Sequence, residues 1–471
     1  MYLHRLHIQR MKRVADLELR FTDAAGAHRP WTVIIGENGT AKTTILQAVA
    51  LAAAGARQVN AVMDRGARFA RDRRAGDAPL EITADFGFSA AGNATALHPH
   101  APPAAGAARR LRSTVSLSAR STSFAAQAAY LGPDGPLDGP DPLVHARDVQ
   151  EQRWFVAGYG VARALPDPAW APDLDNRVIA RLKPLFDSRA NLASVGVTYA
   201  FARRDVEVGD RPGTRARAYS RVLNQILRAG GEALMPGVSG LELRGAGGAQ
   251  TATDLIDADR FKMRTGRAEM VIAGVALSHG FQSTFAWISD LVGHILLDAD
   301  AAVAPEEMEG LVLVDEIDLY LHPKWQASFV GALRRVFPRL QFIVTTHSPV
   351  VLAGLAPEEV VRLQADPETG DVRQVARDPE SGALAPVSGM DAPRVAEADP
   401  RAMTGTEVYE DYFGIGRLTL HPQGEVYREY LTLSGDPLRT DEEDATVSAL
   451  RDTLGRAGFT SVPAPVARAR T

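Results

Sequence analysis

Residues 36–44 have the types and spacing of a loop that binds phosphate. The sequence Gly-Glu-Asn-Gly-Thr-Ala-Lys-Thr-Thr follows the apolar run 31–35 and precedes an alanine-rich segment with helical spacing. In such a strand, loop and helix, backbone N–H groups and the helix N-terminus point at the phosphates of a nucleotide. We expect Lys42 to reach the β- and γ-phosphates of ATP and the Thr43 hydroxyl to bind Mg²⁺. The predicted nucleotide-binding residues of this loop are Gly36, Asn38, Gly39, Ala41, Lys42, Thr43 and Thr44.

Ala41 is the one departure of this loop from the pattern G-x-x-x-x-G-K-[ST], in which its position holds a second glycine. An alanine costs little there if its φ angle is negative, but it crowds the loop if φ is positive. The sequence leaves both conformations open. The alternative interpretation of the segment, a surface turn before an amphipathic helix, is disfavoured by the strand and helix patterns on its two sides.

A pair of acids follows the apolar run 311–314. A buried strand that ends in adjacent carboxylates can place one of them on a metal shell and the other on a water molecule. We therefore expect Asp315 to hold Mg²⁺ through water, and Glu316 to orient or deprotonate the water that attacks the γ-phosphate. The alternative is a strand that ends in a solvated acidic turn.

His347 follows a further apolar run, 342–344. If this strand lies parallel to its predecessor, its imidazole reaches the same edge of the sheet and can hydrogen-bond a γ-phosphate oxygen or the attacking water. A purely structural histidine is the alternative. The predicted catalytic residues are Glu316, His347 and Lys42, and the predicted metal ligands are Thr43 and Asp315.

The segment Leu277-Ser-His-Gly-Phe-Gln282 precedes a helix that we expect from about residue 282 to 297. Ser278 and the Gly280 backbone would then lie at a helix N-terminus, which favours anions. A simple helix cap is the alternative, since this motif is a weak signal by itself.

The four motifs, in this order, resemble those of the ABC-type ATPase heads of the RecF, structural-maintenance-of-chromosomes (SMC) and OLD group. In those heads a leucine-serine-glycine-glycine-glutamine signature closes over ATP held by a second head. The chain keeps Leu277, Ser278, Gly280 and Gln282 of that signature, and departs from it at His279 and Phe281.

The resemblance implies that the ATP site is completed by a second copy of the chain. Ser278 would contact the γ-phosphate of ATP held by the partner, together with Gly280. Asp318 would be the acid of the D-loop, and His347 the switch histidine. ATP and Mg²⁺ are the implied cofactors, and an ATP-dependent homodimer or higher oligomer is the implied assembly.

The expected fold class is α/β, with an ABC-ATPase head made of a mainly parallel core sheet with helices and an antiparallel β subdomain. We expect residues 1–170 and 241–365 to form the two parts of this head, with a mobile loop near 91–111. Residues 171–240 are expected to form an inserted helical lobe, and 366–471 a C-terminal accessory region. The lobe is too short, and too broken by Pro184, Pro212 and Gly213, for a long coiled-coil arm.

Two phrases resemble the stand-alone AAA-family ATPases of bacterial antiphage defence loci, which include the Septu, retron-associated and PARIS ATPases. They are Gly158-Tyr-Gly-Val-Ala-Arg163 and the stretch 277–287. That resemblance implies a separate effector, often an HNH or Toprim nuclease. Downstream of residue 355 no apolar strand delivers an Asp-x-Asp pair, so we expect no nuclease within the chain.

The composition of the chain is that of an ordinary globular protein, with 45% apolar and 23% charged residues in 471. The absence of cysteine excludes disulfides and thiolate chemistry, and no apolar run approaches the roughly 20 residues that span a bilayer. We expect a cytoplasmic protein without membrane contact. The net charge of −5 gives no global attraction to nucleic acid, but Lys and Arg outnumber Asp and Glu in residues 173–228, which makes DNA a candidate partner.

We therefore predict a Mg²⁺-dependent ATP-hydrolysing enzyme that dimerises around ATP and regulates a separate nuclease or toxin. Three alternatives stay open at this point. They are a scaffold that ATP stabilises with little hydrolysis, a RecF-like DNA repair ATPase, and the ATPase subunit of a transporter. The presence of Glu316 argues against the scaffold.

Overall fold

The computed structural model forms two compact units, Met1–Met403 and Thr404–Thr471. It describes residues 1–63, 67, 69–89, 110–163, 176–190, 192, 196–211, 213–242, 260–378, 383–387, 399–414, 423–459 and 461–468. Of the loop expected to be mobile near 91–111, only residues 110 and 111 lie within the described residues. The domain division expected at residues 170, 240 and 365 stays a prediction.

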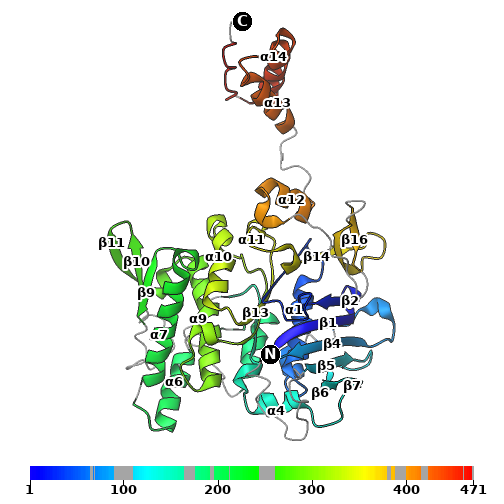
Figure 1. Ribbon diagram of the computed structural model, residues 1–471, viewed down its shortest axis with the longest axis vertical. Coiled ribbons are helices and arrows are strands. Elements are labelled where there is room, and N and C mark those ends of the chain that lie inside the picture. Colours follow the sequence, from blue (N-terminus) through cyan, green and yellow to red (C-terminus); the bar gives the residue numbers. More distant parts are fainter. Residues whose placement is uncertain are drawn as a thin grey trace. The chain divides into compact units, whose positions relative to one another are not determined.

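A seven-stranded sheet forms the centre of the first unit (Figure 1). Its strands lie in the order β16-β15-β14-β3-β13-β12-β8, and the five from β14 to β8 are parallel. β12 and β13 are buried along their whole length, as expected of parallel strands covered on both faces. In sheet order the strands are Leu384–Pro386, Val372–Arg377, Val360–Ala365, Trp31–Gly36, Leu340–Thr345, Gly310–Val314 and Val156–Tyr159.

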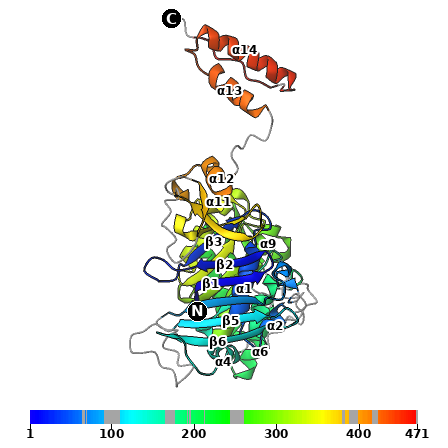
Figure 2. The same cartoon turned by 90° about the vertical axis from the view of Figure 1, so that its right-hand side faces the viewer.

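An antiparallel sheet of six strands forms the second layer, and in Figure 2 this layer faces the viewer. Its order is β2-β1-β4-β5-β6-β7. The strands are Val14–Arg20, Tyr2–Met11, Leu80–Gly87, Arg110–Leu117, Ala125–Gly132 and Gly135–Pro136.

Helix α1 (Lys42–Ala54) contacts strands of both sheets. All of its residues except Thr43 are buried, so it is a core helix without a solvent face. The short helices α2 (Val59–Met63) and α4 (Pro142–Asp148) also contact it. Because β3 leads directly into the loop before α1, the segment predicted to bind phosphate is held between two buried elements.

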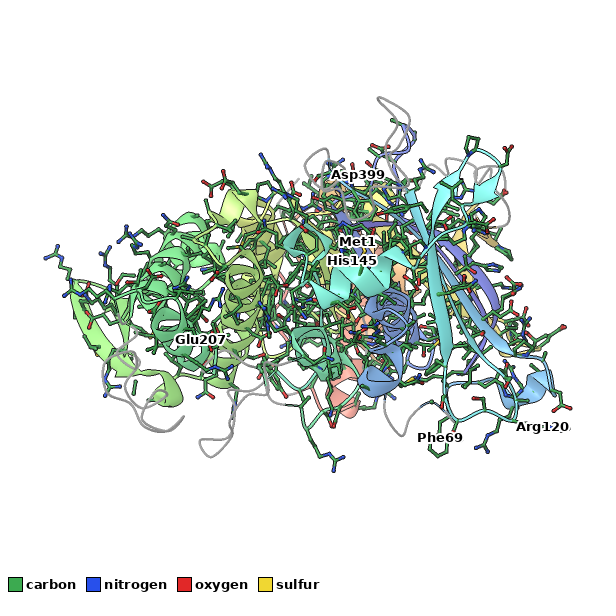
Figure 3. All side chains as sticks on the ribbon, turned by 90° about the horizontal axis from the view of Figure 1, so that it is seen from below. Met1, Phe69, Arg120, His145, Glu207 and Asp399 are labelled. Atoms are coloured by element: carbon green, nitrogen blue, oxygen red, sulfur yellow. The ribbon has the colours of Figure 1, made fainter. Side chains whose placement is uncertain are left out.

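A helical lobe with a small sheet completes the first unit. Figure 3 shows Glu207 of this lobe and Arg120 of the antiparallel layer on opposite sides of the unit. The helices of the lobe are α5 (Arg177–Leu182), α6 (Gly196–Glu207), α7 (Thr214–Gly230) and α9 (His279–Ala299). Its three strands are β9 (Val238–Glu242), β10 (Arg260–Thr265) and β11 (Ala268–Ala273). Two further helices, α10 (Pro323–Val336) and α11 (Pro349–Leu352), follow strands β12 and β13 of the core sheet.

The second unit contains α12 (Gly405–Phe413), α13 (Gly424–Ser434) and α14 (Asp441–Arg456). α13 and α14 pack on a small core of Tyr430, Val447 and Leu454. The sequence pattern did not resolve these helices, because their apolar faces are narrow.

The expected fold class is confirmed, since a mainly parallel core sheet with helices is joined by an antiparallel layer. The helix expected from about residue 282 begins earlier, at His279, so the motif before it forms the first turn of α9. No helix among the described residues is long and apolar enough to cross a bilayer.

Candidate active site

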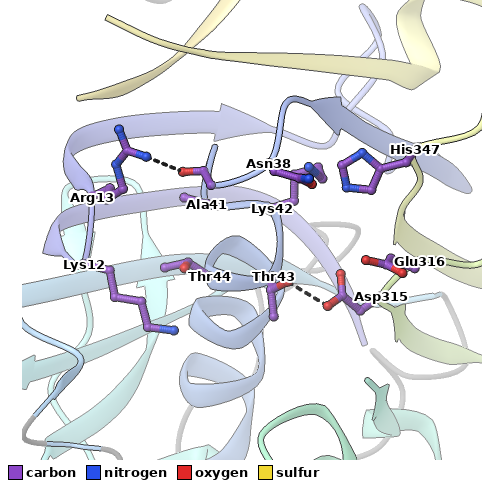
Figure 4. Close-up of a pocket in the computed structure, with 11 residues that line it drawn as sticks. Lys12, Arg13, Asn38, Ala41, Lys42, Thr43, Thr44, Asp315, Glu316 and His347 are labelled. Atoms are coloured by element: carbon purple, nitrogen blue, oxygen red, sulfur yellow. Dashed lines mark hydrogen bonds between the residues drawn. The ribbon is translucent and has the colours of Figure 1, made fainter. Parts of the chain in front are cut away.

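Three of the four motifs meet in one pocket at the carboxyl edge of the core sheet. The neighbouring parallel strands β3, β13 and β12 end at Gly36, Thr345 and Val314. Ligands of open α/β sheets bind at this edge. The pocket has a volume of about 320 Å³ and is shown in Figure 4. It is lined by Lys12, Arg13, Asn38, Gly39, Ala41, Lys42, Thr43, Thr44, Asp315, Glu316 and His347.

The lysine of the loop before α1 is bonded to the backbone of that same loop. Lys42 Nζ donates hydrogen bonds to the carbonyl oxygens of Gly36 and Glu37, at 2.8 and 2.9 Å. Gly36 cannot be replaced without a shift, because a Cβ there would lie 2.6 Å from Thr40 Oγ1 and 2.7 Å from the Leu363 carbonyl. Burial lowers the pKa of Lys42, while the charges of Asp315 and Glu316 oppose that shift.

Ala41 adopts a left-handed conformation, with φ +62° and ψ +18°, immediately before α1. The positive φ resolves the question that the sequence left open. A non-glycine residue in this region costs about 1–2 kcal/mol. The loop therefore carries a local strain at the position where the usual pattern has glycine.

Asp315 accepts two hydroxyl hydrogen bonds at the end of β12. Thr43 Oγ1 donates to its Oδ2 at 2.7 Å, and Thr345 Oγ1 donates to its Oδ1 at 2.6 Å. Adjacent ligands of an octahedral Mg²⁺ ion with bonds of 2.0–2.1 Å lie about 2.9 Å apart. The Thr43 and Asp315 oxygens, joined by a dashed line in Figure 4, are therefore close enough to share one magnesium shell, with Asp315 as a direct ligand or behind a bound water.

Glu316 and His347 lie on the wall of the pocket beside Asp315 (Figure 4). Glu316 has a φ of +48°, an uncommon conformation for a residue with a side chain. Its N–H donates to Thr345 Oγ1 at 2.8 Å. Desolvation, followed by the positive charge of Lys42, lowers the pKa of His347, so its imidazole is neutral at pH 7.

Lys12 and Arg13 line the same pocket from the turn between β1 and β2, and no sequence motif predicts a role for them. Arg13 Nη1 donates to the Gly39 carbonyl at 3.2 Å, and Lys12 Nζ donates to Gln47 Oε1 at 2.8 Å. Burial lowers the pKa of Lys12. Two adjacent cations in a tight turn were a visible signal, but only the fold brings that turn to the phosphate loop.

The fourth motif lies outside this pocket. Ser278 is the exposed N-cap residue of α9, and its side chain does not cap the helix. Gly280 is buried, and a Cβ there would lie 2.5 Å from the Tyr320 carbonyl oxygen. Asp318 accepts a hydrogen bond from Thr346 Oγ1. The Gly280 contact places the first turn of α9 beside Tyr320, in the segment after β12, and none of Ser278, Gly280 and Asp318 lines the pocket of its own chain.

Helix α9 is tied to the pocket through one residue of β8. The Tyr159 hydroxyl donates to Asp290 Oδ2 of α9 at 2.8 Å, and this contact is buried. The Tyr159 carbonyl accepts the Asp315 N–H, also at 2.8 Å.

The fold, and the grouping of three motifs at one edge of the core sheet, are those expected of an α/β ABC-type ATPase head. Residues 250–353 match the family model described as "AAA domain, putative AbiEii toxin, Type IV TA system". The chain is similar to the Septu protein PtuA of Bacillus mycoides, with 24% identity over 371 residues, which cover 78% of this chain and 41% of that protein. It is also similar to the retron Vc95 probable ATPase of Vibrio cholerae, with 42% identity over 84 residues, 18% of this chain and 16% of that one.

The retron Ec83 probable ATPase of Escherichia coli is 37% identical over 117 residues, which cover 25% of this chain and 19% of that protein. The chain spans less than half the length of these relatives. Among solved structures, an SMC head bound to the C-terminal winged-helix domain of ScpA aligns with 80% of this chain and 98% of its own, at 15% identity and a TM-score of 0.44. The expected resemblance to Septu and retron-associated ATPases is confirmed.

Proposed function

We propose that the chain hydrolyses ATP with Mg²⁺, and that it dimerises around the nucleotide to regulate a separate effector in antiphage defence. The observation that carries the first part is the convergence of Lys42, Thr43, Asp315, Glu316 and His347 on one pocket. These are the groups that phosphoryl transfer to water requires, namely a phosphate cradle, metal ligands and residues that position the water.

Each residue has a distinct task in this proposal. Lys42 exchanges its bonds to the Gly36 and Glu37 carbonyls for bonds to the β- and γ-phosphates. A Mg²⁺ ion held near Thr43 and Asp315 would neutralise charge on the phosphate oxygens.

Glu316 accepts a proton from the attacking water or orients that water. His347, being neutral, donates one N–H to the γ-phosphate while its other nitrogen can accept.

The dimer is supported by the position of the fourth motif. Ser278 is exposed and does not line the pocket of its own chain, so its hydroxyl and the N-terminus of α9 are free to face ATP held by a second copy. We propose that Ser278, Gly280 and Asp318 complete the partner's site. ATP then joins the two heads, and hydrolysis releases them.

The role in defence rests on the similarity to proteins named Septu PtuA and retron probable ATPases. We propose a separate nuclease or toxin as the effector, with DNA as a candidate ligand. A scaffold that only binds ATP is the competing function, and the site offers a direct test between the two.

The test is Glu316→Gln, which keeps the shape of the side chain and removes its basicity. A hydrolase should lose turnover by about 100-fold or more and accumulate an ATP-bound dimer, because general bases contribute about 10²–10⁴-fold. Phosphate release and light scattering with ATP and Mg²⁺ measure both effects. The exposed Glu306→Gln is the matched control and should behave as wild type. Undetectable turnover in the wild-type protein would instead favour the scaffold.

The shared site is tested by mixing two inactive variants. Lys42→Ala disables the pocket and Ser278→Arg disables the α9 terminus, so neither should hydrolyse ATP alone. A mixed dimer has one intact site, made of the pocket of one chain and the Ser278 of the other. Random pairing should restore about a quarter of the wild-type turnover in an equimolar mixture. No restoration, with mixed dimers shown to form, would contradict a site shared between chains.

A further inference from the structure

A buried arginine lies directly behind the acidic pair of the pocket. Arg163 follows strand β8 and is 3% exposed. Its Nη1 donates to the Asp315 carbonyl oxygen at 2.5 Å, and its Nη2 donates to the Glu316 carbonyl oxygen at 2.7 Å. It does not line the pocket.

The charge of Arg163 is not used in an ion pair with any described carboxylate. Burial lowers its pKa to about 10, and the negative charges of Asp315, Asp318 and Glu316 oppose that shift. It therefore stays protonated at neutral pH. Within the described residues its guanidinium is directed at main-chain oxygens, and its Nε has no hydrogen-bond partner.

These main-chain bonds act on a backbone that is held away from its usual conformation. Glu316 has a φ of +48°. Its N–H is held by Thr345 Oγ1 at 2.8 Å, and the next N–H, that of Ile317, donates to the Thr345 carbonyl at 2.9 Å. Arg163 holds the two carbonyls of the same stretch. Because the direction of a side chain follows its backbone, these bonds fix where the Glu316 carboxylate points.

We propose that Arg163 is a positioning residue for Glu316, clamping both carbonyls of the acidic pair so that the carboxylate faces the attacking water. This inference rests on the proposed hydrolysis. The fork of a guanidinium can bridge two carbonyl oxygens with fixed geometry, whereas a lysine ammonium cannot reproduce that bridge.

Arg147 is a matched control because it is an equally buried arginine that also donates to carbonyl oxygens. It is 2% exposed and bonds the carbonyls of Ala53 and Trp154 at 2.6–3.2 Å. Ala53 lies near the far end of α1, away from the pocket. A loss of fold stability should be common to both arginines, and a loss of positioning should be specific to Arg163.

The experiment compares Arg163→Lys and Arg147→Lys in the 471-residue chain, each alone and with Glu316→Gln. For Arg163→Lys we expect kcat to fall by about tenfold or more, with the KM for Mg-ATP changed by less than about threefold. In the Glu316→Gln background the same change should cause no further loss in single-turnover measurements, because the residue it positions no longer acts as a base. Arg147→Lys should leave kcat per folded molecule unchanged.

Hydrogen exchange supplies a readout that does not depend on hydrolysis. The amides of Glu316 and Ile317 should exchange faster in Arg163→Lys than in Arg147→Lys, whether or not ATP turns over. Additive losses in the double variant, an unchanged kcat, or unchanged exchange at these two amides would overturn the inference. A wild-type protein that shows protected amides but no phosphate release would overturn the proposed hydrolysis instead, and with it the catalytic purpose of the clamp.

Discussion

Replacing Thr345 by valine removes two hydrogen bonds from the site while keeping the shape of the side chain. The buried hydroxyl of Thr345 donates to Asp315 Oδ1 at 2.6 Å and accepts from the Glu316 N–H at 2.8 Å. Thr32, on the neighbouring strand β3, is equally buried, and its hydroxyl has no partner among the described residues. Thr32→Val is therefore the matched control.

The expected losses of unfolding free energy differ because, among the described residues, the Thr345 hydroxyl has hydrogen-bond partners and the Thr32 hydroxyl has none. A hydrogen bond to a charged group contributes about 1.5–3 kcal/mol and a neutral one about 0.5–1.5, so Thr345→Val should lose about 3 kcal/mol of unfolding free energy. Thr32→Val should lose nothing, or gain up to about 1 kcal/mol, since it removes a buried group without a partner. For a unit of this size, per-residue unfolding entropies translate 3 kcal/mol into a Tm shift of about 3–4 °C.

Urea and thermal unfolding of the two variants, followed by circular dichroism, measure the difference. Thr345→Val should also lower ATP turnover, because the backbone of Glu316 loses one of its supports. If the two valine variants were equally stable to within about 0.5 kcal/mol, the hydroxyl of Thr345 would not be holding the acidic pair.

Three further changes test other parts of the chain. Gly280→Ala should lower the free energy of unfolding by about 1–2 kcal/mol, because the new methyl group clashes with the Tyr320 carbonyl. Gly331→Ala meets only an ordinary contact at 3.7 Å and should raise the free energy of unfolding by up to about 1 kcal/mol through helix α10. The urea midpoints of the two variants measure the difference. Ala41→Gly should change the free energy of unfolding by less than about 1 kcal/mol, because glycine relieves the positive φ but also gains conformational entropy in the unfolded state. Ala41→Val should lower the free energy of unfolding by more than about 1 kcal/mol. Equal stabilities of the two variants in urea unfolding would contradict the left-handed backbone. Burial and nearby arginines lower the pKa of His294 in the folded state. The unfolded state therefore binds more protons below about pH 6.5, and the free energy of unfolding decreases as the pH is lowered. His294→Phe should reduce that decrease by up to about 1.4 kcal/mol per pH unit, as measured by urea titrations at pH 7 and 5.5.

The sequence predicted the pocket because its residues follow strands. Gly36, Asp315 and His347 each come after an apolar run, and parallel neighbours bring their carboxyl ends to one edge. A local pattern thus sufficed to place three distant segments together. Ser278 does not line the pocket of its own chain, and its position opposite a partner, which the resemblance implies, stays a prediction.

What the sequence did not reveal depends on contacts between distant elements. The approach of Lys12 and Arg13 to the phosphate loop requires the antiparallel layer to pack beside α1, and no periodicity specifies that packing. The φ of Ala41 depends on the tertiary constraint on its loop, not on its residue type. Arg163 acts on carbonyl oxygens 152 and 153 residues away, and such a bond has no sequence pattern because every residue carries a carbonyl.

Tyr159 links the middle of helix α9 to the backbone of Asp315. Its hydroxyl holds Asp290 near the middle of a 21-residue helix about 30 Å long, while its carbonyl holds the Asp315 N–H. A tilt of α9 about Asp290 would move the end that carries Ser278 without pulling on the bond between the Tyr159 carbonyl and the Asp315 N–H. A sliding of the whole helix would instead pull on Tyr159 and shift Asp315 with it. A tilt would instead press the first turn of α9 on the Tyr320 carbonyl, four residues after Glu316, so the two motions would reach the acidic pair by different contacts.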